Sequence, residues 1–227
     1  MLPAALESRP ARGTTRGVAL FCHGGTVAKL DPPRERALSL VRMRAMEQYV
    51  HDTCADRGIA THLLRYRVAG WNGPSADAYS DVRWSLEQLR AEYGPDVPVV
   101  LVGHSMGGRA VLRAGGDPQV RAVCALAPWT PPGEPVAHLK DQTVAILHGR
   151  GDRWVPASLS GTFAVRAERA GARVARFTVA GGHSMVRRAH LWHTFARDVV
   201  LAGTGIEPMR PDVEAALCSP GGLAIRL

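Results

Sequence analysis

The fold of this chain is restricted most strongly by a continuous apolar run, Val97–Val102, which is followed at once by Gly103-His104-Ser105-Met106-Gly107. A strand that is apolar at every position is typical of a parallel sheet covered by helices on both faces. Residues 105–114 follow as a predicted helix, so Ser105 lies in a sharp turn between strand and helix. Side chains at 103 or 107 would clash in such a turn, which explains both glycines. The G-x-S-x-G pattern in this context predicts that Ser105 is a nucleophile.

Short apolar runs alternate with longer segments of helical period along the rest of the chain. This alternation predicts an α/β fold, with a mostly parallel sheet of about six strands and helices on both faces. We expect one domain over residues 1–227, with its core at 17–202 and with 1–16 and 203–227 as terminal extensions. The expected strands lie at 17–22, 59–67, 97–102, 121–127, 143–147 and 174–179.

Helices are expected between these strands. The first is predicted to begin near Asp31 and to bury a stripe formed by Leu38, Val41, Ala45 and Tyr49, because these residues are spaced by three and four. The second is predicted to bury Ala78, Val82, Leu86 and Leu89. Two more are expected at about 157–170 and 187–202.

Charge and cysteine content exclude several classes of protein. The chain has 28 basic and 20 acidic residues, and all the basic residues except Lys29 and Lys140 are arginines. The arginines are spread along the chain without a basic cluster, so we expect no nucleic-acid partner. The four cysteines form no C-x-x-C pair, which favours a reducing compartment and argues against a zinc site or a disulfide framework.

Membrane and export segments are not expected. No apolar stretch reaches the roughly 18 residues that a membrane-spanning helix needs. Residues 1–16 contain no apolar run, which argues against a secretory signal. We therefore expect a cytoplasmic protein without a membrane partner.

A serine hydroxyl needs a base, and the base needs a carboxylate that orients it. His183 follows Gly181-Gly182 directly after the last predicted strand, so its loop reaches the same sheet edge as Ser105. Asp152 follows the fifth strand and precedes His183, which produces the chain order Ser, Asp, His. The alternatives for Asp152 are a helix N-cap or a salt bridge with Arg150 or Arg153.

Acyl transfer also needs two N–H donors for the developing oxyanion. We expect one from the backbone of Met106, the residue after the nucleophile. The second is expected from the loop after the first strand, His23-Gly24-Gly25-Thr26, with Gly25 as first choice and Thr26 in reserve. The alternative is that this loop is a plain turn.

Three tryptophans are candidates for substrate binding. Trp71, Trp129 and Trp154 lie in loops that follow strands ending on the same side as Ser105. Such side chains supply flat apolar walls, so they predict a shallow, open pocket for short acyl chains. The alternative is that these tryptophans pack the loops onto the sheet.

Through these motifs the sequence resembles the α/β-hydrolase superfamily, and the resemblance extends from about Gly17 to about Ala202. The residues that carry the resemblance are His23-Gly24-Gly25, Gly103-His104-Ser105-Met106-Gly107-Gly108, Leu147-His148-Gly149-Arg150-Gly151-Asp152 and Gly181-Gly182-His183. Only 16 residues precede the first predicted strand, and only about 15 (Pro128–Gln142) occupy the place where many relatives insert a helical cap. The resemblance therefore implies a minimal enzyme without a cap, similar to small actinobacterial esterases and dienelactone-hydrolase-type proteins.

This resemblance implies a serine hydrolase for small-molecule carboxylic esters or thioesters, with no metal and no organic cofactor. The sequence does not separate it from an acyltransferase or amidase with the same three residues, because pocket shape selects the acceptor. A non-catalytic binding module on the same fold is the third possibility. The oligomeric state does not follow from the sequence.

Overall fold

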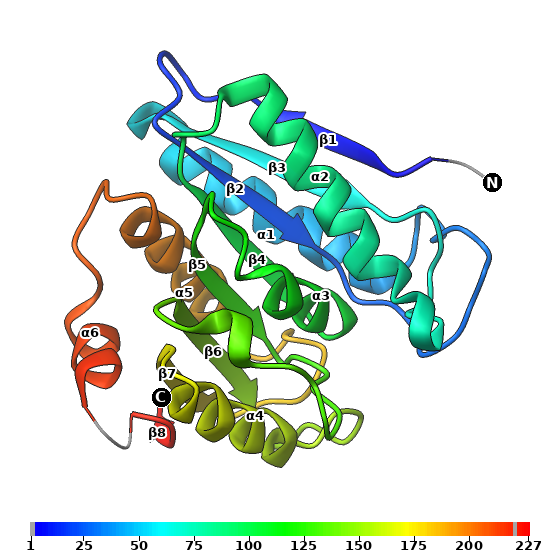
Figure 1. The fold of residues 1–227 in the computed structure, drawn as a ribbon, viewed down its shortest axis with the longest axis vertical. Helices are drawn as coiled ribbons and strands as arrows, with labels where there is room; N and C mark the ends of the chain where they lie inside the picture. The colour runs from blue at the N-terminus through cyan, green and yellow to red at the C-terminus, as the bar shows by residue number, and fades with distance from the viewer. Residues whose placement is uncertain (1–2, 220–221) are drawn as a thin grey trace.

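The structure is a computed structural model that describes residues 3–219 and 222–227. Within these residues, eight strands form one sheet in the order β1-β3-β2-β4-β5-β6-β7-β8 (Figure 1). Every neighbouring pair is parallel except β1 and β3, which are antiparallel. The strands are β1 (Ala5–Arg9), β2 (Gly17–Cys22), β3 (Ile59–Arg65), β4 (Val99–His104), β5 (Val120–Leu126), β6 (Thr143–Gly149), β7 (Arg173–Val179) and β8 (Ile225–Arg226).

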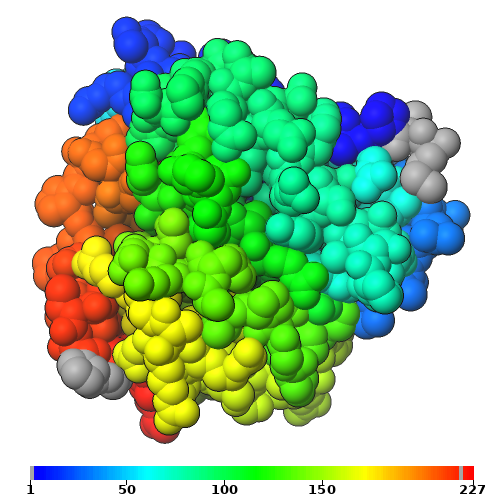
Figure 2. Space-filling view, viewed as in Figure 1, coloured from blue at the N-terminus to red at the C-terminus, as the bar shows by residue number. Residues whose placement is uncertain are grey.

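Helices cover both faces of the sheet. One face carries α1 (Leu38–Cys54), α5 (Ala189–Gly203) and α6 (Pro211–Cys218). The other carries α2 (Asp77–Tyr93), α3 (Met106–Ala114) and α4 (Ala157–Arg169), and it faces the viewer in Figures 1 and 2. Successive side chains of a strand point to opposite faces, so Val18 and Leu20 join one core while Ala19 and Phe21 join the other. This explains why the central strands are apolar at nearly every position.

The α/β fold class is confirmed, and the six predicted strands correspond to β2–β7 with ends that agree within two residues. The expected number of strands was too low. β1 lies at 5–9, inside the predicted N-terminal extension, and β8 adds a short parallel edge beside β7. Both are edge strands whose residues are exposed or only partly buried, so neither needs the continuous apolar run of a strand covered on both faces.

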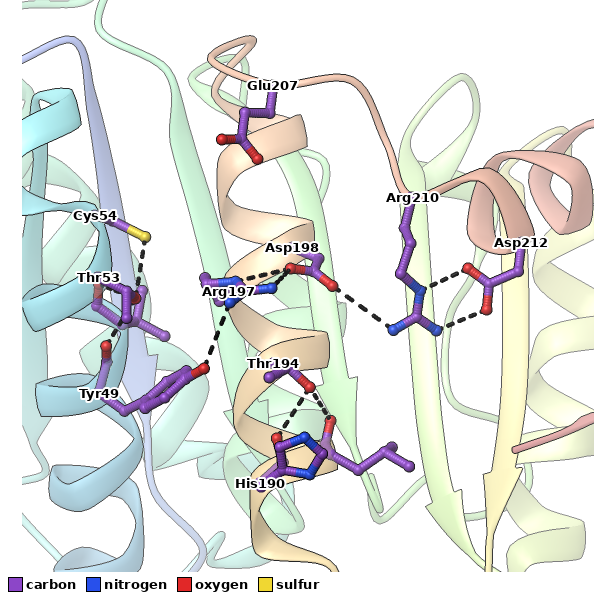
Figure 3. A network of polar contacts seen from close by, with 12 residues as sticks. Tyr49, Thr53, Cys54, His190, Thr194, Arg197, Asp198, Glu207, Arg210 and Asp212 are labelled. Atoms are coloured by element: carbon purple, nitrogen blue, oxygen red, sulfur yellow. Dashed lines mark hydrogen bonds and ion pairs between the residues drawn. The ribbon is translucent and has the colours of Figure 1, made fainter.

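The predicted C-terminal extension is attached to the sheet through α6, whose Val213, Ala216 and Leu217 are buried. Figure 3 shows polar contacts that hold the segment leading into this helix. Asp198 of α5 pairs with Arg197 at 2.6 Å and with Arg210 at 3.6 Å, and Arg210 pairs with Asp212 at 2.6 Å. These contacts explain how a short helix after a loop is held on the sheet face.

The predicted buried stripe of α1 was wrong, whereas that of α2 is confirmed. Helix α1 begins at Leu38, not near Asp31, and Leu38 and Val41 are 67% and 45% exposed. The helix instead buries Leu40, Met43, Met46, Val50 and Cys54. Both stripes have helical spacing, and only the position of the sheet decides which one is covered.

The expected absence of a cap agrees with the segment between β5 and β6. Residues 127–142 form a loop with one short 3₁₀ turn, Ala137–Leu139, and the described chain shows no inserted helical layer there. None of the described helices has the length and apolar character needed to cross a membrane.

Candidate active site

The turn between β4 and α3 holds Ser105 in a backbone conformation that L-residues rarely adopt, with φ 56° and ψ −116°. Two close approaches force this turn. A Cβ at Gly103 would collide with the carbonyl of Gly107, and a Cβ at Gly107 would collide with the carbonyl of Cys22 at the end of β2. The glycines therefore allow α3 to start directly against the neighbouring strands, with Ser105 at the edge of the sheet.

The structure brings Ser105, His183 and Asp152 into one hydrogen-bonded series. Nε2 of His183 lies 2.8 Å from Oγ of Ser105, and its Nδ1 lies 2.7 Å from Oδ2 of Asp152. A carboxylate accepts hydrogen bonds, so Nδ1 carries the hydrogen, and Nε2 is left to accept one from the serine hydroxyl. The three residues lie in loops after β4, β6 and β7, which are parallel and end at the same sheet edge.

The carboxylate of Asp152 is buried, and both of its oxygens accept hydrogen bonds. Its Oδ1 accepts from the backbone N–H groups of Trp154 and Val155, both at 2.9 Å. Burial opposes its ionisation, but hydrogen bonds from His148, Val155 and His183 outweigh burial and hold the pKa of Asp152 well below its usual range. Within the described chain, Asp152 pairs with neither Arg150 nor Arg153, and Pro156 is the N-cap of α4.

Behind Asp152 lies a second row of polar groups that the sequence motifs did not predict. Nε2 of His148 lies 3.2 Å from Oδ2 of Asp152 and 3.0 Å from the carbonyl of Val155, so Nε2 carries a hydrogen. Its Nδ1 lies 2.8 Å from Oγ of Ser160, which accepts from Nε of Arg176 at 3.1 Å. All four side chains are buried. The spacing of His148 and Asp152, four residues apart across a strand end, was the only sign of this row in the sequence.

His104, the residue before the nucleophile, holds the backbone of His183. Its Nε2 donates to the carbonyl of His183 at 2.9 Å. Burial, together with the nearby His183, lowers the pKa of His104 to about 3, so this imidazole is neutral near pH 7.

Two of the expected N–H donors are free in the described part of the chain. The N–H groups of Met106 and Gly25 have no acceptor there. Gly25 packs so closely on Met106 that a Cβ would collide with the Met106 side chain. The reserve candidate, Thr26, was wrong, because its N–H donates to the carbonyl of Ala69 at 2.9 Å in an isolated bridge. The loop after β2 is therefore pinned at Thr26 and leaves Gly25 unbonded beside α3.

A cavity of about 410 Å³ opens in front of Ser105. Trp129 and Trp154 line it, and Trp154 is 78% exposed with its ring centroid 5.7 Å from that of His183. The remaining described lining comes from the loop after β2, the first turns of α1 and the strand ends: Gly24, Gly25, Thr26, Val27, Leu38, Ser39, Arg42, His104, Ser105, Met106, Val155 and His183. The participation of α1 was not foreseen, because its exposed residues were expected in the core.

The third predicted binding residue, Trp71, was wrong. It is 2% exposed and does not line the cavity. The guanidinium of Arg109 lies 3.8 Å from its ring centroid, and Trp129 meets it edge to face at 6.3 Å. Trp71 therefore packs its loop onto α3 and supports Trp129 from behind.

The described residues contain no group of three or more histidine, cysteine, aspartate or glutamate side chains that could hold a metal ion. The arrangement around Ser105 consists of a hydroxyl, an imidazole, a carboxylate and free backbone N–H groups. These are the parts that acyl transfer through a serine nucleophile uses.

Comparison with known proteins identifies the family of this chain. The sequence model of the alpha/beta hydrolase family matches residues 19–222. No curated protein matches the chain.

Several solved structures share the fold. Est1E from Butyrivibrio proteoclasticus, with ferulic acid bound, is 14% identical with a TM-score of 0.65, over 89% of this chain and 96% of that chain. XC6422 from Xanthomonas campestris, described as an α/β serine hydrolase without a lid, is 17% identical with a TM-score of 0.59, over 92% and 91%. Esterase PE8 is 18% identical with a TM-score of 0.66, over 87% and 100%. At these identities the likeness shows the fold alone.

Proposed function

Because this chain belongs to the alpha/beta hydrolase family, we propose that it is a serine hydrolase that cleaves carboxylic esters or thioesters through an acyl-enzyme on Ser105. The observation that carries the proposal is the series Ser105–His183–Asp152, with hydrogen-bond distances of 2.8 Å and 2.7 Å. A strained serine at a strand-to-helix turn, with an imidazole already in place to accept its proton, has the geometry of an activated nucleophile.

In the first half of the reaction, Oγ of Ser105 attacks the carbonyl carbon while its proton passes to Nε2 of His183. Asp152 stabilises the imidazolium that forms and keeps Nδ1 protonated. The free N–H groups of Met106 and Gly25 donate to the oxyanion of the tetrahedral intermediate. The intermediate collapses when His183 returns its proton to the leaving alcohol or thiol, which leaves an acyl group on Ser105.

Water completes the reaction. His183 removes a proton from the water that attacks the acyl-enzyme, and the acid leaves when Ser105 regains its proton. The exposure of Val27, Leu38 and Trp154, at 65%, 67% and 78%, supports water as the acceptor because the rim of the cavity is open to solvent. The named neighbours support an ester substrate at the level of the fold, since they include an esterase and a serine hydrolase without a lid.

The test is labelling with a fluorophosphonate, followed by turnover of p-nitrophenyl acetate. We expect one phosphonate adduct on the wild-type protein and none on Ser105→Ala, with ester hydrolysis lower by several orders of magnitude in the variant. Ser184, next to His183, provides the matched control, and Ser184→Ala should be labelled like the wild type. An adduct that persists in Ser105→Ala, or no adduct on the wild type, would falsify the assignment.

A further inference from the structure

The cavity in front of Ser105 carries one formal charge among its described lining residues, and that charge is positive. Arg42 of α1 supplies it, and no aspartate or glutamate lines the cavity. The carboxylate of Asp152, which contacts the lining residue His183, is buried and accepts hydrogen bonds on both oxygens. A ligand in this cavity therefore meets a cation and no opposing anion.

Arg42 is held at the cavity by its place on α1. Leu38 and Ser39, which also line the cavity, lie four and three residues before it, respectively, and so share its helix face. The opposite face, with Leu40 and Met43, is buried in the core. Within the described chain Arg42 forms no salt bridge, whereas Arg44, on the other side of the helix, pairs with Glu7 at 2.6 Å. Arg42 is half-buried and lines the cavity, and its charge is close enough to His104, another lining residue, to contribute to the lowered pKa of that imidazole.

Two smaller recesses adjoin the cavity and have the same sign of charge. One shares Trp154 and His183 with it and is lined by Arg153. The other shares the loop after β2 and is lined by Arg34 and by Lys29, whose ammonium group pairs with Asp31 at 3.9 Å. Of the described residues that line these recesses, none is acidic. The start of α1 also lies at the cavity with no side-chain cap, which places the positive end of the helix dipole on the same side.

From this arrangement we propose that the preferred substrates are esters or thioesters that carry a carboxylate, and that Arg42 determines this preference by pairing with the carboxylate. This inference rests on the proposed function and adds the substrate class. A guanidinium binds a carboxylate through two parallel hydrogen bonds, and partial burial strengthens the pairing because water screens it less. The apolar walls formed by Leu38, Trp129 and Trp154 surround the part of the substrate between the carboxylate and the scissile bond.

The test compares esters that differ only in charge. Mono-p-nitrophenyl adipate and p-nitrophenyl hexanoate have acyl chains of equal length, and 4-acetoxybenzoate and its methyl ester place the same difference on the leaving group. We expect Arg42→Gln to lower kcat/KM for the anionic member of at least one pair by roughly tenfold to a hundredfold, the usual range for a hydrogen bond to a charged group. The neutral members should be cleaved at nearly the wild-type rate.

Arg83→Gln serves as the matched control, because Arg83 is an arginine without a salt bridge in the described chain that lines a different cavity, on α2. It should leave both pairs unchanged. The inference is overturned if Arg42→Gln lowers kcat/KM equally for charged and neutral esters, or if it changes neither. The proposed function fails separately, through the absence of phosphonate labelling at Ser105, so the two failures are distinguishable.

Discussion

Nε2 of His148 lies 3.2 Å from Oδ2 of Asp152, the same carboxylate oxygen that accepts from His183. His148 is completely buried, and Ser160 and Arg176 continue the hydrogen-bonded row behind it. Arg176 also donates to the carbonyl of Leu223, near the C-terminus. The position of Asp152 is thus determined by a polar row that runs from β6 through α4 and β7 to the end of the chain.

We expect the loss of His148 to weaken catalysis through Asp152. His148→Leu should lower kcat on short esters by on the order of tenfold to a hundredfold with KM unchanged, because a small displacement of Asp152 misorients His183. His148→Gln, which keeps a donor near the carboxylate, should recover part of the rate. Circular dichroism checks that both variants fold, and wild-type rates in both would show that His148 does not position Asp152.

The three residues of the proposed series should act as a unit. His183→Ala should cost about as much activity as Ser105→Ala, and Asp152→Asn should cost somewhat less, because the amide alters the tautomer of the imidazole but leaves the nucleophile in place. The double variant Ser105→Ala/His183→Ala should be no slower than either single variant. If the rate losses of the two single variants multiplied in the double variant, the result would contradict a joint role.

The buried histidines should make stability depend on pH. Burial lowers the pKa of His104 to about 3 and that of His23 to about 4, from an ordinary value of 6.5. Between pH 6.5 and about 4 the unfolded chain binds protons at these residues that the folded chain does not, so the free energy of unfolding falls as the pH falls. Each histidine contributes a slope of about 1.4 kcal/mol per pH unit near pH 5.

Urea unfolding at pH 7, 6 and 5 measures this slope. In His104→Gln one of the two contributions is absent, so the loss of stability between pH 6 and 5 should be smaller than in the wild type by about 1 kcal/mol. His23→Gln should reduce this loss in the same way, because burial also lowers the pKa of His23. Equal slopes in His104→Gln and the wild type would contradict the assignment.

The open cavity should favour short acyl chains. We expect kcat/KM to be highest for p-nitrophenyl esters with roughly two to six acyl carbons, because each further CH₂ that stays in water gains none of the about 0.8 kcal/mol that burial supplies. Trp154→Ala and Trp129→Ala should lower kcat/KM most for the longer members of this range, since both side chains line the cavity. A steep optimum at about twelve carbons or more would contradict an open, shallow site.

Trp71 should behave differently from the other two tryptophans. Trp71→Ala should lower the free energy of unfolding by about 3–5 kcal/mol, because it removes a fully buried side chain together with its contacts to Arg109 and Trp129. The chain-length profile should keep its shape where the protein is still folded. Trp154→Ala should change stability little, since Trp154 is 78% exposed. The reverse pattern would mean that Trp71 reaches the substrate.

Local patterns in the sequence determined the α/β class, the strands β2–β7 and the turn at Ser105. A central strand must be apolar on both faces, and the close approach of Gly103 to Gly107 tolerates no larger residue at either position. Both features can therefore be recognised from neighbouring residues in the sequence. The order Ser105, Asp152, His183 could be predicted because each residue directly follows a strand, and parallel strands end at one edge.

The tertiary structure alone decided the contacts that depend on which surfaces meet. In the structure the predicted stripe of α1 lies away from the core, and Leu38 and Arg42 line the cavity. Trp71 is buried, whereas Trp154 is exposed. The fold also assembled His148, Ser160 and Arg176 behind Asp152 from three separate elements. Helical spacing allows several faces of a helix to be buried, and a hydrogen bond between distant residues leaves no periodic pattern, so only packing against the sheet selects among the possibilities.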